Sequence, residues 1–186
     1  RLRLEGGPRP VGAARPGAAP GGGADLGPAS HYRAATRDLS LGFPEINLGL
    51  LPGAGGTVRL PRIVGLKTTL EMMTGGAPIG FERAQALGIV DRELVGEPKL
   101  AAIAYAEELI AQNAPVRRLR ERPLADADTG AAGAAICAEF AKTLSRAGKR
   151  VRAAERIVSA IEACATQPFA EALAHARTLF EACRVS

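Results

Sequence analysis

The segment Leu41–Arg62, with the sequence LGFPEINLGLLPGAGGTVRLPR, constrains the fold of this chain more than any other. A single carboxylate, Glu45, stands between Pro44 and an apolar run, and a glycine cluster then opens into a helix-like stretch. A reaction that moves a proton next to a carbonyl group needs such parts, because it uses a positioned acid or base and backbone amides that the substrate can approach closely. The segment predicts a site at Glu45; the alternative is a solvated turn glutamate.

The composition permits one domain with a substantial core. The chain has 186 residues, of which 47% are apolar and 4% aromatic, so Ala, Leu and Val must fill the interior. The net charge of +5 could suit anionic ligands or nucleic acid, but an arginine- and alanine-rich proteome is the simpler explanation. Basic and aromatic residues do not alternate, so nucleic acid is not expected as a partner.

Three cysteines, Cys137, Cys164 and Cys183, are widely spaced on helix-like stretches. They show neither disulfide pairing nor metal-ligand spacing, which predicts a reducing compartment and no metal site. No apolar run is long enough to span a membrane, and the first residues lack the apolar centre of a signal peptide. We therefore expect a cytoplasmic protein, or one of the organelle matrix or peroxisome in a eukaryote; the missing initiator Met suggests a fragment.

Glycine, proline and helical periodicity divide the chain. Residues 1–30 are dense in Gly and Pro and, from composition alone, predict a flexible arm. Residues 116–130 predict a linker or exposed turn. Short extended pieces are expected at 34–36 and 48–51, and helices at 57–63, 66–73, 81–87, 100–113, 131–147, 151–164 and 169–184.

Leu41–Arg62 resembles the enoyl-CoA hydratase/isomerase (crotonase) family over almost its whole length. Upstream, Pro10–Gly17 and Gly21–Leu26 fall where that family has a strand and then a Gly-Gly-Gly-x-Glu-Leu helix start, and His31-Tyr-Arg follows where relatives often carry the same triplet. Downstream, Gly88-Ile-Val-Asp is similar to the family's Gly-Leu-Val-Asp. On this resemblance the Gly/Pro-rich arm is a strand, a turn and a helix start of the active site.

The resemblance implies an α/β fold of crotonase type. It places a partial ββα spiral with the active-site segments in residues 1–113 and a helical C-terminal region in residues 114–186. Residues 114–123 and 168–180 look like the hydratase part of multifunctional fatty-acid oxidation enzymes. Roughly the first third of the family's domain is absent, and relatives assemble as trimers, so a homo-oligomer is expected.

The implied activity is that of an enoyl-CoA hydratase in fatty-acid β-oxidation, which adds water in syn fashion to a trans-2-enoyl-CoA. By resemblance, Glu45 exchanges the proton at the α-carbon, Asp25 helps to activate water, Gly22 donates a backbone N–H to the oxyanion, and Gly53 lines the site. Acyl-CoA is the substrate, and the absence of Gly-x-Gly-x-x-Gly predicts no nicotinamide cofactor. The alternatives are a Δ3-Δ2-enoyl-CoA isomerase that uses Glu45 alone, and a catalytically inactive crotonase fragment.

Several residues depart from the family pattern. Asp25 stands where the family has Glu, so its carboxylate is one methylene shorter, and it could instead be an N-terminal helix residue. Gly22 could be a turn glycine. Pro28 falls just inside the helix that follows the oxyanion glycine, and Arg15 replaces an apolar strand residue, where a buried arginine without a partner would be costly.

The remaining histidines and two arginines have simpler expectations. His31 and His175 are expected to serve structure or surface rather than catalysis. Arg59 and Arg62 could reach a phosphate, but we expect them on the surface of a helix.

Overall fold

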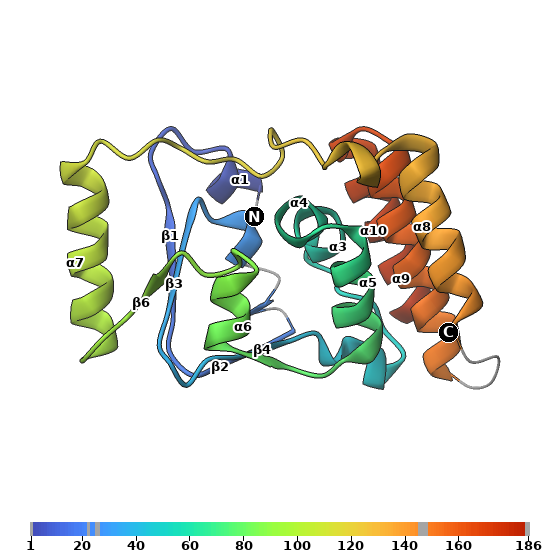
Figure 1. Ribbon diagram of the computed structural model, residues 1–186, viewed down its shortest axis with the longest axis horizontal. Helices are drawn as coiled ribbons and strands as arrows, with labels where there is room; N and C mark the ends of the chain where they lie inside the picture. The colour runs from blue at the N-terminus through green and yellow to red at the C-terminus, as the bar shows by residue number, and fades with distance from the viewer. Residues whose placement is uncertain (1, 22, 25–26, 145–148, 185–186) are drawn as a thin grey trace.

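The computed structural model describes residues 2–21, 23–24, 27–144 and 149–184. The molecule is elongated, with two small sheets between a lone helix at one end and a helical layer at the other (Figure 1). The lone helix is α7 (Pro98–Ala111). The helical layer consists of α8 (Gly130–Lys142), α9 (Lys149–Thr166) and α10 (Phe169–Arg184).

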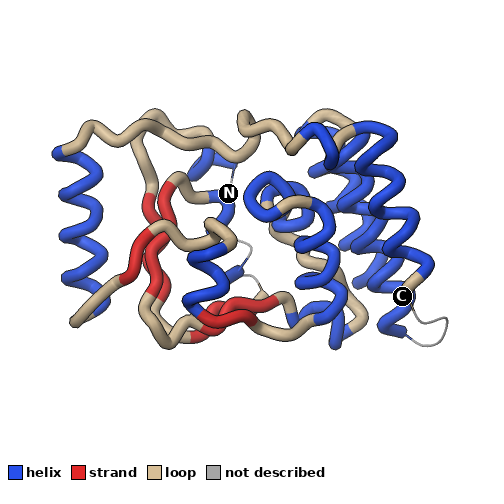
Figure 2. Tube along the Cα trace, in the orientation of Figure 1, coloured by secondary structure: helices blue, strands red, loops and turns tan. Residues whose placement is uncertain are grey.

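The strands form two three-stranded sheets, drawn in red in Figure 2. In the first, β1 and β6 pair in parallel with the central β3; in the second, β2 is parallel and β5 antiparallel to the central β4. The strands are β1 (Gly12–Arg15), β2 (Ala18–Pro20), β3 (Tyr32–Ala35), β4 (Ser40–Gly42), β5 (Ile79–Gly80) and β6 (Arg92–Glu93). The parallel pairing of β2 with β4 makes the segments that follow these two strands leave the sheet at the same edge.

Short helices connect the sheets to the C-terminal layer. They are α1 (Leu2–Glu5), η1 (Gly27–Ala29), η2 (Pro44–Leu48), α3 (Gly56–Arg59), α4 (Pro61–Val64), α5 (Leu66–Gly75), α6 (Phe81–Ala86) and η3 (Asp126–Asp128). The single helix predicted over 57–63 is two helices, because Pro61 lacks the N–H that would continue α3 and instead occupies the first turn of α4.

Helix α5 confirms the prediction for 66–73. Leu66, Leu70 and Met73 are fully buried on one face, and the helix ends where Gly76 takes the left-handed conformation at φ 70°. Helices α8 and α9 pack against α5, and one continuous hydrophobic core joins α5 to Ile157 of α9. The crotonase-type α/β architecture is thus a sheet region joined through α3, α4 and α5 to a layer of C-terminal helices (Figure 1).

Two regions differ from the expectations based on composition. Residues 1–30 contain α1, β1 and β2, so the prediction of a flexible arm is wrong; strand pairing to β3 and β4 orders these glycine- and proline-rich residues. Arg15, at the end of β1, is half-buried with its guanidinium directly against Gly27, a space that any side chain at position 27 would fill. Pro28 lies buried in a 3-10 turn. No strand forms at 48–51, because η2 occupies Leu48 and irregular chain follows.

Helix α7 confirms the helix predicted over 100–113 but begins earlier. The side chain of Glu97 accepts hydrogen bonds from the backbone N–H groups of Lys99 and Leu100, and Pro98 suits the first helical position. No residue of α7 is buried: Leu100 is 66% exposed and Ile110 75% exposed. Among the described residues, no helix is both long enough and apolar enough to cross a bilayer.

Candidate active site

The candidate site forms where β2 and β4 end. Gly21, the residue after β2, donates its N–H to the carbonyl oxygen of Gly42 at the end of β4, with a donor–acceptor distance of 2.9 Å. Glu45 follows Gly42 by one short turn and lies in η2. The sheet therefore brings the glycine-rich turn and the carboxylate together, as the predicted site requires.

The carboxyl group of Glu45 lies directly against the Cα of Gly21. A methyl group on that Cα would lie 2.7 Å from Oε1 of Glu45, closer than side-chain carbons approach other atoms. Gly21 also has φ +52°, a left-handed conformation that a residue with a Cβ adopts at a cost. Glycine is thus required at position 21 both by its conformation and by the space that Glu45 occupies.

Glu45 is half-buried, and one of its oxygens is isolated. Within the described residues, Oε2 is buried and has no hydrogen-bond partner. Burial raises the pKa of Glu45 above its usual value, and a hydrogen bond from its own backbone N–H opposes that shift. A carboxyl group with a raised pKa and a free oxygen is suited to exchanging protons with a bound molecule.

The backbone around Glu45 is firmly anchored. The neighbouring side chains of Phe43 and Ile46 are each 1% exposed, so they fix the residues on both sides of the carboxylate in the core. Pro44 starts the 3-10 turn, and Gly49 ends it in a left-handed conformation. Helices α5 and α9 pack against η2, so elements from both halves of the chain hold the turn that carries Glu45.

Two predicted site residues, Gly22 and Asp25, lie outside the described residues. The roles of Gly22 as an oxyanion donor and Asp25 as a partner in water activation therefore stay predictions. Gly21, which the sequence analysis did not single out, is the glycine whose contact with Glu45 the structure describes. The sequence signal that could have identified Gly21 is its position beside Gly22 in the run of three glycines.

Gly53 lies against the C-terminal helix α10. A methyl group on its Cα would lie 2.6 Å from the ring of Phe180, so the aromatic ring covers this glycine. The role of Gly53 in lining the site stays a prediction. The helical periodicity of residues 169–184 shows which face of α10 is apolar, but it does not identify Gly53 as the partner of Phe180.

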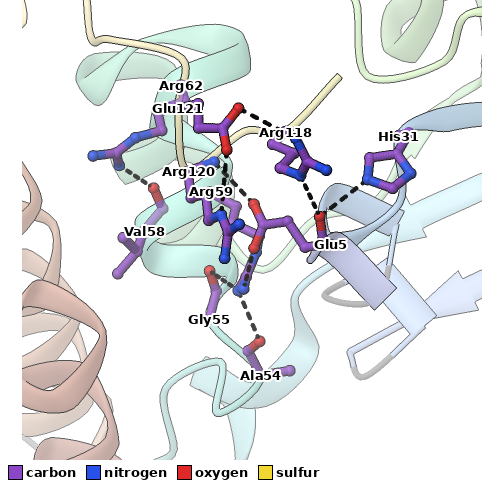
Figure 3. A network of polar contacts seen from close by, with 10 residues as sticks. All are labelled: Glu5, His31, Ala54, Gly55, Val58, Arg59, Arg62, Arg118, Arg120 and Glu121. Carbon is purple, nitrogen blue, oxygen red and sulfur yellow. Dashed lines mark hydrogen bonds and ion pairs between the residues drawn. The ribbon is translucent and has the colours of Figure 1, made fainter. Parts of the chain in front are cut away.

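A fully buried glutamate, Glu5, lies at the centre of a polar network (Figure 3). Its Oε2 accepts hydrogen bonds from Nη2 of Arg59 at 2.9 Å and from Nε at 3.2 Å, and Oε1 accepts from the backbone N–H of Arg120 at 2.9 Å. The side chains of Glu5 and Arg59 are each 1% exposed. The expectation that Arg59 lies on a helix surface is therefore wrong, because Glu5 neutralises it inside the molecule.

Arg62 and His31 also serve the structure. Arg62, expected on a helix surface, is buried and donates hydrogen bonds to the carbonyl oxygen of Val58 at 2.5 Å and to Sγ of Cys164 at 2.9 Å. Nδ1 of His31 accepts the backbone N–H of Val11, so Nε2 carries the proton and donates to the carbonyl oxygen of Glu5 at 3.1 Å. The structural role expected for His31 is thus consistent with its contacts. Among the described residues, no three His, Cys, Asp or Glu side chains are grouped as metal ligands.

Comparison with known proteins gives a consistent result. The family model described as Enoyl-CoA hydratase/isomerase matches residues 2–136. A Peroxisomal bifunctional enzyme of Cavia porcellus is 35% identical over 172 residues, covering 92% of this chain and 23% of that protein. A Probable enoyl-CoA hydratase of Bacillus subtilis (strain 168) is 44% identical over 112 residues, covering 57% of this chain and 43% of that protein.

Solved structures add a match at the level of the fold. A protein of Hyphomonas neptunium described as belonging to the enoyl-CoA hydratase/isomerase family is 35% identical, with a TM-score of 0.53, over 58% of this chain and 42% of that one. The chain thus spans less than half the length of each of these relatives.

Proposed function

This chain belongs to the enoyl-CoA hydratase/isomerase family, and on that premise we propose that its Glu45 site adds water to a trans-2-enoyl-CoA. The contact between the Glu45 carboxyl group and Gly21 is the observation that supports this proposal most directly. It joins a carboxyl group that can carry a proton to the glycine turn where a thioester can approach the backbone.

The reaction needs three groups in one place. The oxygen of water forms a bond to the β-carbon, and the electrons of the double bond move onto the thioester oxygen, where backbone N–H groups stabilise the enolate. Glu45, starting as the ionised carboxylate, takes a proton from the attacking water and delivers it to the α-carbon, so that no proton is gained or lost overall. In this proposal, Gly22 donates to the enolate oxygen, Asp25 helps to hold the water, and Gly53 lines the site.

Hydration of crotonyl-CoA, followed by the loss of enoyl absorbance, tests the proposal. Replacing Glu45 by Gln keeps the shape of the side chain but removes its proton exchange, so we expect kcat/KM to fall by about 10²- to 10⁴-fold. Glu71→Gln, an exposed substitution on α5, is the matched control and should keep the parental rate. A folded Glu45→Gln variant with the activity of the parent would contradict the proposal, as would a folded but inactive parent.

A Δ3-Δ2-enoyl-CoA isomerase is the second candidate. Of the described carboxylates, Glu45 is the one in contact with Gly21, and a shuttle of a single proton can use one carboxylate alone. Asp25→Ala separates the two reactions, because hydration depends on a second carboxylate and isomerisation does not. Loss of hydration with isomerisation of a 3-enoyl-CoA intact would favour the isomerase.

An inactive fragment that packs against a partner is the third possibility. Ile110 and Leu100 of α7 are largely exposed, and apolar side chains gathered on a surface favour association. We propose a homo-oligomer, a trimer by analogy with the family. Light scattering after size-exclusion chromatography would distinguish such an oligomer of defined mass from aggregates of undefined mass. The proposed compartment is reducing, either cytoplasmic or, as in the name of the Cavia porcellus relative, peroxisomal.

A further inference from the structure

A cavity lies along the segment between α7 and η3, apart from the contact of Glu45 with Gly21. It has a volume of about 330 Å³. Its lining is dominated by arginine: the walls are His31, Arg33, Arg117, Arg118, Leu119, Glu121 and Arg122. The sequence of residues 116–130 predicts an exposed linker or turn, but hydrogen bonds hold this part of the segment in place.

Backbone carbonyl groups position the arginines of this cavity. Arg117 stacks on the ring of Tyr32, with 3.8 Å to the ring centre, and its Nε donates to the carbonyl oxygen of His31 at 3.1 Å. Arg118 donates to the carbonyl oxygens of Glu5 and Gly7 at 3.2 and 3.0 Å; Figure 3 shows its contact with Glu5 beside that of His31. These guanidinium groups are ordered before any ligand arrives, which lowers the entropy cost of binding.

The carboxylates at the cavity do not balance its positive charge. Asp91 is shared between Arg33 and Arg117, with contacts of 3.5 and 3.0 Å. Glu121 is likewise shared between Arg118 and the neighbouring Arg120, at 3.6 and 3.7 Å.

Arg122 adds a further positive charge to this cavity. In the part of the chain that the structure describes, nothing accepts a hydrogen bond from the side chain of Arg122 or pairs with it, and Arg122 also repels the charge of Arg33. Four guanidinium groups line the cavity, whereas two carboxylates of the described residues, Asp91 and Glu121, contact them.

We propose that this cavity binds a phosphoryl group of a small ligand, with Arg122 as its main unpaired donor and Arg117 and Arg118 as preorganised neighbours. Guanidinium groups present paired N–H donors that match the oxygens of a phosphate, and a multiply charged anion neutralises more than one of them. The concave shape, with Leu119 in its wall, favours a compact terminal phosphate over an extended polymer. The inference does not depend on the activity proposed for Glu45.

Isothermal titration with inorganic pyrophosphate at constant ionic strength tests this site. We expect Arg122→Ala to weaken binding by about tenfold or more, because it removes a charged donor from an exposed position. Arg177→Ala on α10 makes the same change in net charge at another exposed position and should bind like the parent. Thermal melting of both variants confirms that each is folded, so a loss of binding reports on the site.

Three results would overturn the inference: no saturable binding by the parent, equal weakening by Arg122→Ala and Arg177→Ala, or unchanged binding in Arg122→Ala. Equal weakening would indicate attraction to the net positive charge rather than to this cavity. Displacement of pyrophosphate by coenzyme A would identify the phosphates of the thioester carrier as the source of the ligand. Binding that coenzyme A leaves unaffected, but that Arg122→Ala weakens, would identify a separate phosphorylated ligand.

Discussion

Glu5 is fully buried and Glu45 is half-buried, and the surroundings of the two carboxyl groups differ. Glu5 is buried beside Arg59, and both of its oxygens accept hydrogen bonds from groups on α3 and the 116–130 segment. Glu45 lies beside Gly21 with one buried oxygen that has no partner among the described residues. A buried carboxylate with all its hydrogen bonds satisfied joins parts of the chain, whereas one that lacks a partner remains available for proton exchange.

The largest expected contrast is in stability. Glu5→Gln leaves the charge of Arg59 buried without its partner, so we expect the free energy of unfolding to fall by about 3–5 kcal/mol. Glu45→Gln removes a charge that has no ionic partner, so the same free energy should hold or rise. Urea denaturation of both variants measures the difference. Equal losses in the two variants would show that the two glutamates have the same structural role.

A smaller effect is expected from Gly21→Ala, which tests the contact itself. The added methyl group would lie 2.7 Å from Oε1 of Glu45, so the carboxyl group must move. Displacement of a catalytic group by about 1 Å can lower a rate by about 10²-fold, which we expect in kcat/KM for crotonyl-CoA. Gly75→Ala at the end of α5 is the control, since a methyl group there meets no atom within 4 Å. If Gly21→Ala kept the activity of the parent, catalysis would not depend on this contact.

The smallest expected effect is a dependence of stability on pH. Burial raises the pKa of Glu45, so the folded chain retains this proton to a higher pH than the unfolded chain does. Its contribution to stability is therefore present below the unfolded pKa of about 4.3 and is lost as the pH rises through the higher folded value. The unfolding free energy of the parent should therefore fall relative to that of Glu45→Gln over that interval.

Activity should show the opposite trend with pH, because the proposed reaction starts from the ionised form of Glu45. kcat/KM should then rise as Glu45 loses its proton, with an apparent pKa above that of an exposed glutamate. Denaturation curves and initial rates measured across the same buffers provide both profiles. A stability difference between parent and Glu45→Gln that stays constant with pH would show that Glu45 does not titrate with a raised pKa.

Local sequence predicted several parts of this fold well. The apolar spacing of Leu66, Leu70 and Met73 and the glycines that follow define α5, and Pro98 and Glu97 explain why α7 begins before the predicted 100–113. The family resemblance correctly replaced the flexible arm with a strand at Gly12–Arg15. Composition alone failed there, because pairing with a neighbouring strand orders glycine-rich residues that have little structural preference of their own.

The sequence by itself determined the family, the main helices and one acid, Glu45, that a glycine cluster follows along the chain. Only the tertiary structure decided that Glu5 neutralises Arg59, that Phe180 covers Gly53, and that the arginines after α7 surround a cavity. The physical reason is that periodicity and turn chemistry act over a few neighbouring residues. The partner of a buried charge, by contrast, depends on which distant segments the packed core brings together.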